Sequence, residues 1–225
     1  MTVVLNPGST VMFTGDSITD CFRRSGSGTE EGLGHGYPLR IAGEWGLRHP
    51  DRPVTWLNTG IRGHRVADLC ARWQADVLDA RPDVVSILVG VNDMGWPTLD
   101  PHGRVIPVDE FEAGYDNLLA PLAEAGVELI LIEPFLLPIA GEMRAGRHAV
   151  LIGEAERQQW RADLDPKIQA VRRLARKYRA KLLAADGMFA ELAATTGSEH
   201  WAADGIHPTP AGHAALAAAW LRLVA

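Results

Sequence analysis

A serine, an aspartate and a histidine stand in sequence contexts that suit nucleophilic chemistry. Ser17 follows an apolar run, within the sequence GDSITD at residues 15–20. Near the other end of the chain, Asp204 and His207 belong to the sequence DGIHP. A hydroxyl becomes an effective nucleophile when an imidazole accepts its proton and a carboxylate orients that imidazole. Together these three side chains could form a triad that attacks an ester carbonyl.

Each of these contexts also has a simpler structural interpretation. Serine is among the commonest helix N-caps, so Ser17 alone could merely cap a helix. Asp204 and His207 alone could form a capping turn that leaves the histidine on the surface. The triad interpretation therefore depends on further residues of the same site.

Two other segments could supply the donors that a tetrahedral oxyanion needs. Asn92, in the sequence GVND at residues 90–93, offers a side-chain amide. In residues 58–63 (NTGIRG), the backbone N–H of a glycine such as Gly63 can approach the same oxygen closely. A lone glycine-rich turn is usually only a turn. All four segments, however, lie beside predicted strand ends.

Apolar runs of strand length alternate with segments of helical periodicity. Nearly continuous apolar runs are typical of strands covered on both faces of a parallel sheet. The predicted strands are residues 10–14, 54–57, 84–89, 127–132 and 180–185. The predicted helices are residues 38–47, 65–80, 109–125 and 166–178, and a last helix with Thr209 as N-cap and Pro210 in its first position.

This alternation predicts a three-layer α/β/α, flavodoxin-like fold with about five parallel strands, in one domain covering residues 1–225. In such sheets ligands bind beyond the carboxyl ends of the strands, where the four segments begin. Residues 134–153 form a long connection rich in proline and glycine, which is typical of a lid or contact loop.

The four segments resemble the conserved blocks of the SGNH hydrolases, also called the GDSL family. Residues 15–18 (GDSI) resemble the first block, with isoleucine where the family name has leucine. Gly63 matches the glycine of the second block, Asn92 the asparagine of the third, and Asp204 with His207 the last block. The resemblance spans nearly the whole chain and implies the SGNH hydrolase fold.

The resemblance also implies roles for these residues in ester hydrolysis. Ser17 would attack the ester carbonyl, His207 would act as base and then acid, and Asp204 would hold the imidazolium. The backbone N–H groups of Ser17 and Gly63, with the Asn92 amide, would form the oxyanion hole. No metal or organic cofactor is implied.

A narrower set of motifs is similar to the acetylxylan-esterase branch of this family. The motifs are GDSITDC at residues 15–21, GHGY at 34–37, DL at 68–69, ARW at 71–73 and PDVVSI at 82–87. This branch implies an intracellular homo-oligomer that removes acetyl groups from xylo-oligosaccharides. One departure is Ala203, which precedes Asp204 where the branch has a bulky aromatic residue.

Four residues near the predicted site are candidates for substrate contacts: Asp16, Arg62, Trp96 and Trp201. The tryptophan rings could stack on a sugar or pack beneath loops. Arg62 could bind substrate oxygens or stay solvated at the surface.

Composition restricts the partners. The 225 residues carry a net charge of −6 without a concentrated run of Lys and Arg, which disfavours nucleic acid and anionic membranes as partners. The two cysteines form no C-x-x-C motif, and the histidines show no metal-ligand spacing. With no signal-peptide pattern and no membrane-length apolar segment, the sequence predicts a cytoplasmic protein with a small-molecule ester substrate, such as an acetylated oligosaccharide.

Three alternatives remain open at this point. The first is another SGNH hydrolase, a lysophospholipase, thioesterase or arylesterase that acts on lipid or aryl esters. The second is a non-catalytic ligand-binding domain on the same fold. The third is a flavodoxin-like binder of phosphate or FMN, with residues 14–19 as its phosphate loop.

Overall fold

At the centre of the computed structural model lies a five-stranded sheet in which every pair of neighbours is parallel. The structure describes residues 2–24, 30–95, 104–139, 143–145 and 150–225. The strand order is β2-β1-β3-β4-β7. The strands are β1 (Thr10–Gly15), β2 (Thr55–Asn58), β3 (Val84–Leu88), β4 (Glu128–Ile132) and β7 (Lys181–Leu183). The predicted parallel sheet and three-layer fold are thereby confirmed.

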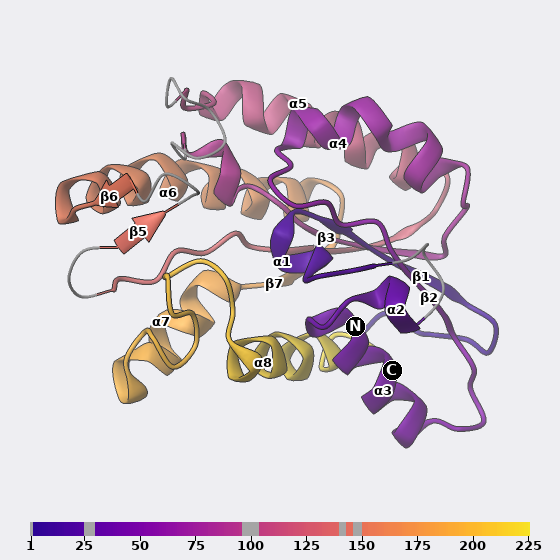
Figure 1. Cartoon of the computed structure of the whole chain (residues 1–225). Coiled ribbons are helices and arrows are strands. Elements are labelled where there is room, and N and C mark those ends of the chain that lie inside the picture. Colours follow the sequence, from indigo (N-terminus) through magenta and orange to yellow (C-terminus); the bar gives the residue numbers. More distant parts are fainter. Residues whose placement is uncertain (1, 25–29, 96–103, 140–142, 146–149) are drawn as a thin grey trace.

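Helices cover both faces of the sheet (Figure 1). One layer holds α3 (Tyr37–Arg48), α7 (Ala185–Thr196) and α8 (Pro210–Leu221), and the other holds α4 (Val66–Trp73), α5 (Val108–Glu124) and α6 (Glu154–Lys177). The alternation of side chains along a strand explains the two layers. In β1, Val11 and Phe13 pack into the core on the α3 and α8 side, whereas Met12 packs into the core beneath α4 and α5.

The remaining elements are short. They are α1 (Ser17–Asp20), α2 (Glu30–Leu33), the π-helix η1 (Gln74–Leu78), the 3-10 helix η2 (Val91–Asp93), and the antiparallel strands β5 (Met143–Ala145) and β6 (Val150–Ile152). Both α1 and η2 directly follow sheet strands, so they begin at the carboxyl edge where ligands bind.

The start of α8 follows the sequence prediction. The Thr209 hydroxyl accepts a hydrogen bond from the N–H of Gly212 at 3.2 Å, and Pro210 occupies the first turn. This cap fixes the end of the loop that carries His207.

The helix predicted at residues 166–178 is longer than expected, because α6 begins at Glu154 and contains Pro166. A proline inside a helix removes one backbone hydrogen bond. Here Trp160, Leu164 and Ile168 recur every fourth residue on one buried face, and their burial keeps the helix continuous through the proline.

Two other predicted elements differ from the structure. The strand predicted at residues 180–185 covers only β7, because Ala185 already belongs to α7, a helix that the sequence analysis did not predict. The helix predicted at residues 65–80 is α4 followed by η1. Of the long connection at 134–153, the described part includes β5 and β6.

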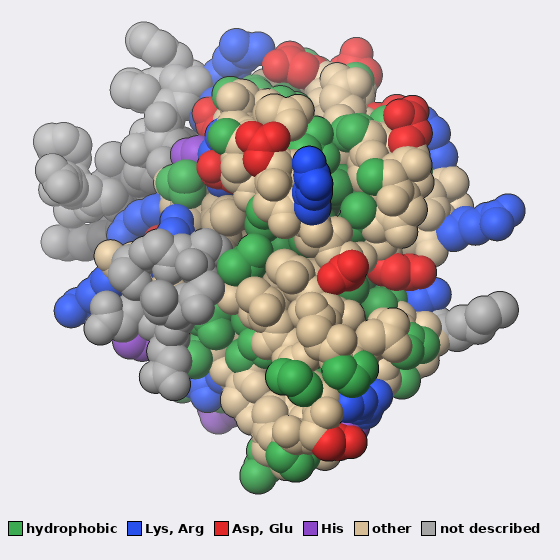
Figure 2. All heavy atoms as spheres, turned by 90° about the vertical axis from the view of Figure 1, so that its right-hand side faces the viewer, with side chains coloured by type: hydrophobic (Ala, Val, Ile, Leu, Met, Phe, Trp, Pro, Cys, Tyr) green, Lys and Arg blue, Asp and Glu red, His purple; other side chains and the backbone are tan. Residues whose placement is uncertain are grey.

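On the face shown in Figure 2, acidic and basic side chains are interspersed over the surface. Within the described ranges, no helix has both the length and the apolar character that crossing a bilayer requires.

Candidate active site

Ser17, His207 and Asp204 are in hydrogen-bonding contact with one another, although the serine and the histidine are 190 positions apart. Ser17 Oγ lies 2.9 Å from His207 Nε2. His207 Nδ1 lies 2.6 Å from Asp204 Oδ2. This arrangement suits a hydroxyl whose proton passes to an imidazole that a carboxylate holds.

The loop that carries Asp204 and His207 orients the carboxylate through its own backbone. Asp204 Oδ1 accepts hydrogen bonds from the N–H of Ile206 at 2.9 Å and of His207 at 2.7 Å. The other oxygen, Oδ2, is therefore directed at the imidazole. Gly205 has a φ of 79°. Its N–H donates to the carbonyl of Ala202, and its carbonyl accepts from the N–H of Leu137. The loop is thus fixed on both sides.

The electrostatics of the pair favour a charged imidazole opposite a charged carboxylate. Burial alone would lower the pKa of His207, but the hydrogen bond and charge of Asp204 outweigh it, so the pKa is raised above 6.5. Burial alone would raise the pKa of Asp204, but the His207 side chain and two backbone N–H donors hold that pKa below its ordinary value. The imidazole is therefore a stronger base than a free histidine.

Ser17 is the first residue of α1, so its backbone N–H has no acceptor within the helix. Asp16 is the N-cap, and its Oδ1 accepts from the N–H of Ile18 at 2.9 Å. Its side chain is fully buried, which raises its pKa to about 7. The expected substrate contact of Asp16 is therefore not supported, because a substrate cannot reach a fully buried carboxyl group.

Gly63 lies in a turn between β2 and α4. The turn is closed by a hydrogen bond from the N–H of His64 to the carbonyl of Ile61, and Gly63 sits in its third position with a φ of 82°. Residues that carry a side chain rarely adopt such a positive φ, so the turn favours glycine at this position.

Asn92 lies in η2, beyond the end of β3, and is buried, with 7% of the residue exposed. Its Nδ2 donates to the carbonyl of His64 at 3.0 Å. An amide nitrogen carries two hydrogens, so one remains for an oxyanion. In the strand order observed, β1 and β3 flank the point where the chain changes direction across the sheet, and Ser17 and Asn92 follow these two strands.

The remaining candidates for substrate contacts differ in placement. Arg62 is exposed, and its charge acts on both Asp20 and His207, so it lies near the imidazole at the surface. Trp201 is half-buried against the core beneath α8, and its Nε1 donates to Thr196 Oγ1 at 2.7 Å. Trp96 lies outside the described residues.

Two buried residues near the site have roles that the sequence analysis did not assign. Asn58 ends β2, and its side chain bonds to the carbonyls of Thr19 and Leu33 and to the N–H of Gly60. The signal in the sequence that could have identified Asn58 is its position directly after an apolar run. His213 accepts from the N–H of Tyr37 at Nδ1, and burial lowers its pKa to about 4, so it stays neutral.

Among the described residues, no three His, Cys, Asp or Glu side chains are grouped as a metal site would require. A cavity of about 770 Å³ lies between α6, α7 and the segment after β4, and its lining includes none of Ser17, Asp204 and His207.

The fold and this site define the class of protein. Residues 13–215 match the model of the GDSL-like lipase/acylhydrolase family. The chain belongs to this family, and it is a carboxylic ester hydrolase.

The similarity extends to particular proteins. The chain is 32% identical over 223 residues to an acetylxylan esterase of Geobacillus stearothermophilus, covering 97% of this chain and 94% of the relative. A crystal structure of Axe2, an acetylxylan esterase from Geobacillus stearothermophilus, superposes with a TM-score of 0.79 at 30% identity, covering 97% and 94% of the two chains. A protein described as a GDSL-like lipase from Parabacteroides merdae superposes with a TM-score of 0.86 at 29% identity, covering 99% and 98%. Catalytic mutants of Axe2 with a serine or a histidine changed to alanine have also been solved.

Proposed function

We propose that this enzyme removes acetyl groups from xylo-oligosaccharides or related sugars through an acyl-enzyme intermediate on Ser17. The observation that carries the proposal is the continuous hydrogen-bonded chain from Ser17 Oγ through His207 to Asp204. The similarity to an acetylxylan esterase over 97% of the chain supports the substrate class. The catalytic mutants of Axe2 support the use of a serine and a histidine.

In the first half of the reaction, Ser17 Oγ attacks the acetyl carbonyl carbon while its proton passes to His207 Nε2. The carbonyl oxygen becomes an oxyanion, which the N–H groups of Ser17 and Gly63 and the free hydrogen of the Asn92 amide stabilise. As the intermediate collapses, the bond to the sugar oxygen breaks. That oxygen takes the proton from His207, so the sugar leaves as an alcohol and an acetyl ester remains on Ser17.

In the second half, a water molecule takes the place of the alcohol. His207 Nε2 accepts a proton from the water as its oxygen attacks the acetyl carbon, and the same oxyanion forms. Collapse breaks the bond to Ser17 Oγ, which recovers the proton from His207, and acetic acid leaves and then loses its proton to solvent. Asp204 stays ionised throughout and stabilises the imidazolium that forms twice in each cycle.

The test compares acyl groups and then natural substrates. Initial rates on acetyl and octanoyl p-nitrophenyl esters are measured for the wild type and for Ser17→Ala, followed by mass spectrometry of acetylated xylo-oligosaccharides. We expect the acetyl ester to be cleaved faster and the oligosaccharides to lose 42 Da for each acetyl group, which is the mass of C2H2O, with no loss in the variant.

Much faster cleavage of octanoate, without deacetylation of the oligosaccharides, would identify a lipid or aryl esterase of the same family instead. The variant Ser17→Ala separates either activity from spontaneous hydrolysis. Full activity in that variant would contradict the proposed nucleophile.

A further inference from the structure

The loop at residues 59–64 carries the parts on which the proposed oxyanion hole depends. It contains Gly63, whose N–H is a proposed donor, and the carbonyl of His64, which holds the Asn92 amide at 3.0 Å. Its start is anchored to β1 by hydrogen bonds from the N–H of Thr59 to Phe13 and from the N–H of Ile61 to Gly15. Any shift of this loop would move both donors.

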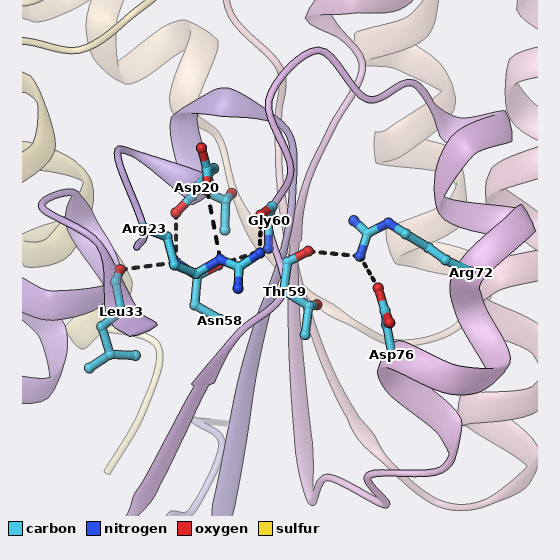
Figure 3. Close-up of polar contacts among 9 residues, drawn as sticks. Asp20, Arg23, Leu33, Asn58, Thr59, Gly60, Arg72 and Asp76 are labelled. Atoms are coloured by element: carbon cyan, nitrogen blue, oxygen red, sulfur yellow. Dashed lines mark hydrogen bonds and ion pairs between the residues drawn. The ribbon is translucent and has the colours of Figure 1, made fainter. Parts of the chain in front are cut away.

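One side of the loop is held by the segment that bears the nucleophile (Figure 3). The buried Asn58 side chain bonds to the carbonyl of Thr19 at 2.7 Å and to the N–H of Gly60 at 2.8 Å. Arg23 Nη2 donates to the carbonyl of Gly60 at 3.1 Å. These contacts tie the start of the loop to α1.

On its other side, the loop is held by the guanidinium group of Arg72 on α4 (Figure 3). Arg72 Nη1 donates to the carbonyl of Thr59 at 2.7 Å, and Arg72 Nε lies 3.2 Å from His64 Nδ1. The group thus reaches both the first and the last residue of the loop. Asp76, four residues further along, accepts a hydrogen bond at Oδ2 from Arg72 Nη1 at 2.5 Å, which fixes the guanidinium group.

The chemistry of His64 matches this contact. Its Nδ1 has to be an unprotonated acceptor to receive the Arg72 Nε–H. Burial and then the charge of Arg72 lower the pKa of His64, which keeps the ring neutral. The same residue offers its carbonyl to Asn92, so a continuous path of hydrogen bonds runs from Asp76 through Arg72 and His64 to the proposed donor.

We propose that Arg72 is a positioning residue that holds the Gly63 and Asn92 donors in place for the transition state. The proposal rests on the proposed function, because it assigns Arg72 to the oxyanion hole of that reaction. Only 14% of the Arg72 side chain is exposed, and it reaches the loop from a helix that bears none of Ser17, Asp204 and His207. A planar guanidinium can donate in two fixed directions at once, which a lysine ammonium on a flexible chain cannot do equally well.

The test uses Arg72→Lys and Arg72→Gln, with Arg48→Gln as the matched control. Arg48 makes a similar ion pair four residues along its own helix, with Glu44 at 2.6 Å, but at an exposed position on α3. We expect Arg72→Gln to lower kcat on p-nitrophenyl acetate by roughly 10- to 100-fold with little change in KM, since removing a whole oxyanion donor costs 10²–10³. Arg72→Lys should show a smaller loss and Arg48→Gln none.

A second readout separates positioning from general destabilisation. Since Arg72 is proposed to hold both donors, Arg72→Gln should lower kcat less in an Asn92→Ala background, where one of these donors is already missing, than in the wild type. Equal losses in both backgrounds would overturn the proposal, as would wild-type kcat in both Arg72 variants. If Arg72→Gln fails to fold, Asp76→Asn, at a side chain 34% exposed, is measured in the same two backgrounds and judged by the same criterion.

Failure of this inference is distinguishable from failure of the proposed function. If Ser17→Ala and Asn92→Ala abolish or reduce hydrolysis while both Arg72 variants turn over normally, only the role of Arg72 is wrong. If Ser17→Ala retains full activity, the proposed reaction itself is wrong.

Discussion

At the scale of single residues, the two oxygens of Asp204 have different partners. Oδ1 accepts from two backbone N–H groups, and Oδ2 meets the imidazole of His207. The carboxylate cannot rotate freely, because turning it would break bonds at the other oxygen. It therefore fixes both the position of the ring and the nitrogen that faces Ser17.

The pH dependence of kcat/KM on a neutral ester follows from His207. The free base accepts the proton of Ser17, so activity should rise with pH through one inflection and then reach a plateau. Since the Asp204 contact raises the pKa of His207, the inflection should lie above 6.5. The measurement is a rate profile between pH 5 and 9 in buffers of constant ionic strength.

Asp204→Asn is the matched variant for this profile. It keeps the shape of the side chain but removes the charge, so turnover should fall by roughly 10⁴-fold, as the loss of the orienting carboxylate does in other triads. A wild-type profile that stays flat between pH 5 and 8 would contradict the assignment of His207 as the base.

The residues of the candidate triad could be predicted from the sequence because their types and order match a family pattern. The structure brings Ser17, Asp204 and His207 together. Asp16 shows the limit of the same reasoning. It belongs to the same motif as Ser17, yet its side chain turns inward to cap α1, and no property of the motif distinguishes a carboxyl group that faces the substrate from one that is buried.

At the scale of elements, the loop between α7 and α8 holds the imidazole through close packing of its backbone. A Cβ added at Gly205 would lie 2.5 Å from the carbonyl of Leu137, in addition to the strain of a φ of 79°. The segment after β4, which contains Leu137, therefore leaves no room for a side chain at Gly205 in the loop that carries His207.

Gly205→Ala should consequently lower both stability and turnover. We expect a loss of about 1–3 kcal/mol in the free energy of unfolding, from strain and a backbone clash together, with a lower kcat because His207 moves. Chemical denaturation and p-nitrophenyl acetate hydrolysis measure the two effects.

Gly187→Ala is the control, because Gly187 lies in α7 with open space around its Cβ position. An alanine there should be neutral or stabilising by up to about 1 kcal/mol. Gly205→Ala with wild-type stability and activity would show that the loop tolerates a side chain and is not held as described.

The elements of the sheet were easier to predict than the helices around α6 and α7. Buried strands are recognisable in a sequence as short apolar runs, and the five predicted strands lie close to the observed ones. The first half of α6 is polar apart from Trp160 and Leu164, so its periodicity is sparse, and Pro166 suggested a start where the helix in fact continues. The alanines at the start of α7 fit the end of an apolar strand as well as they fit the start of a helix.

At the scale of the whole molecule, the site exists only because the sheet brings distant segments to one edge. The nucleophile follows β1, Asn92 follows β3, and His207 arrives from the loop before α8. The two ends of the chain also meet, as Val3 pairs with Val224 beside the core. Contacts between segments this far apart, such as that between Ser17 and His207, depend on the assembled fold and leave no local signal in the sequence.

The central claim is that the folded chain activates one hydroxyl, that of Ser17. The most direct measurement is intact-protein mass spectrometry after reaction with an aryl phosphonate ester, followed by peptide mapping. The folded wild type should gain a single phosphonyl group on Ser17, His207→Ala should react far more slowly, and Ser17→Ala and the urea-unfolded wild type should gain none. An adduct on another residue, or equal labelling of Ser17→Ala, would contradict the account.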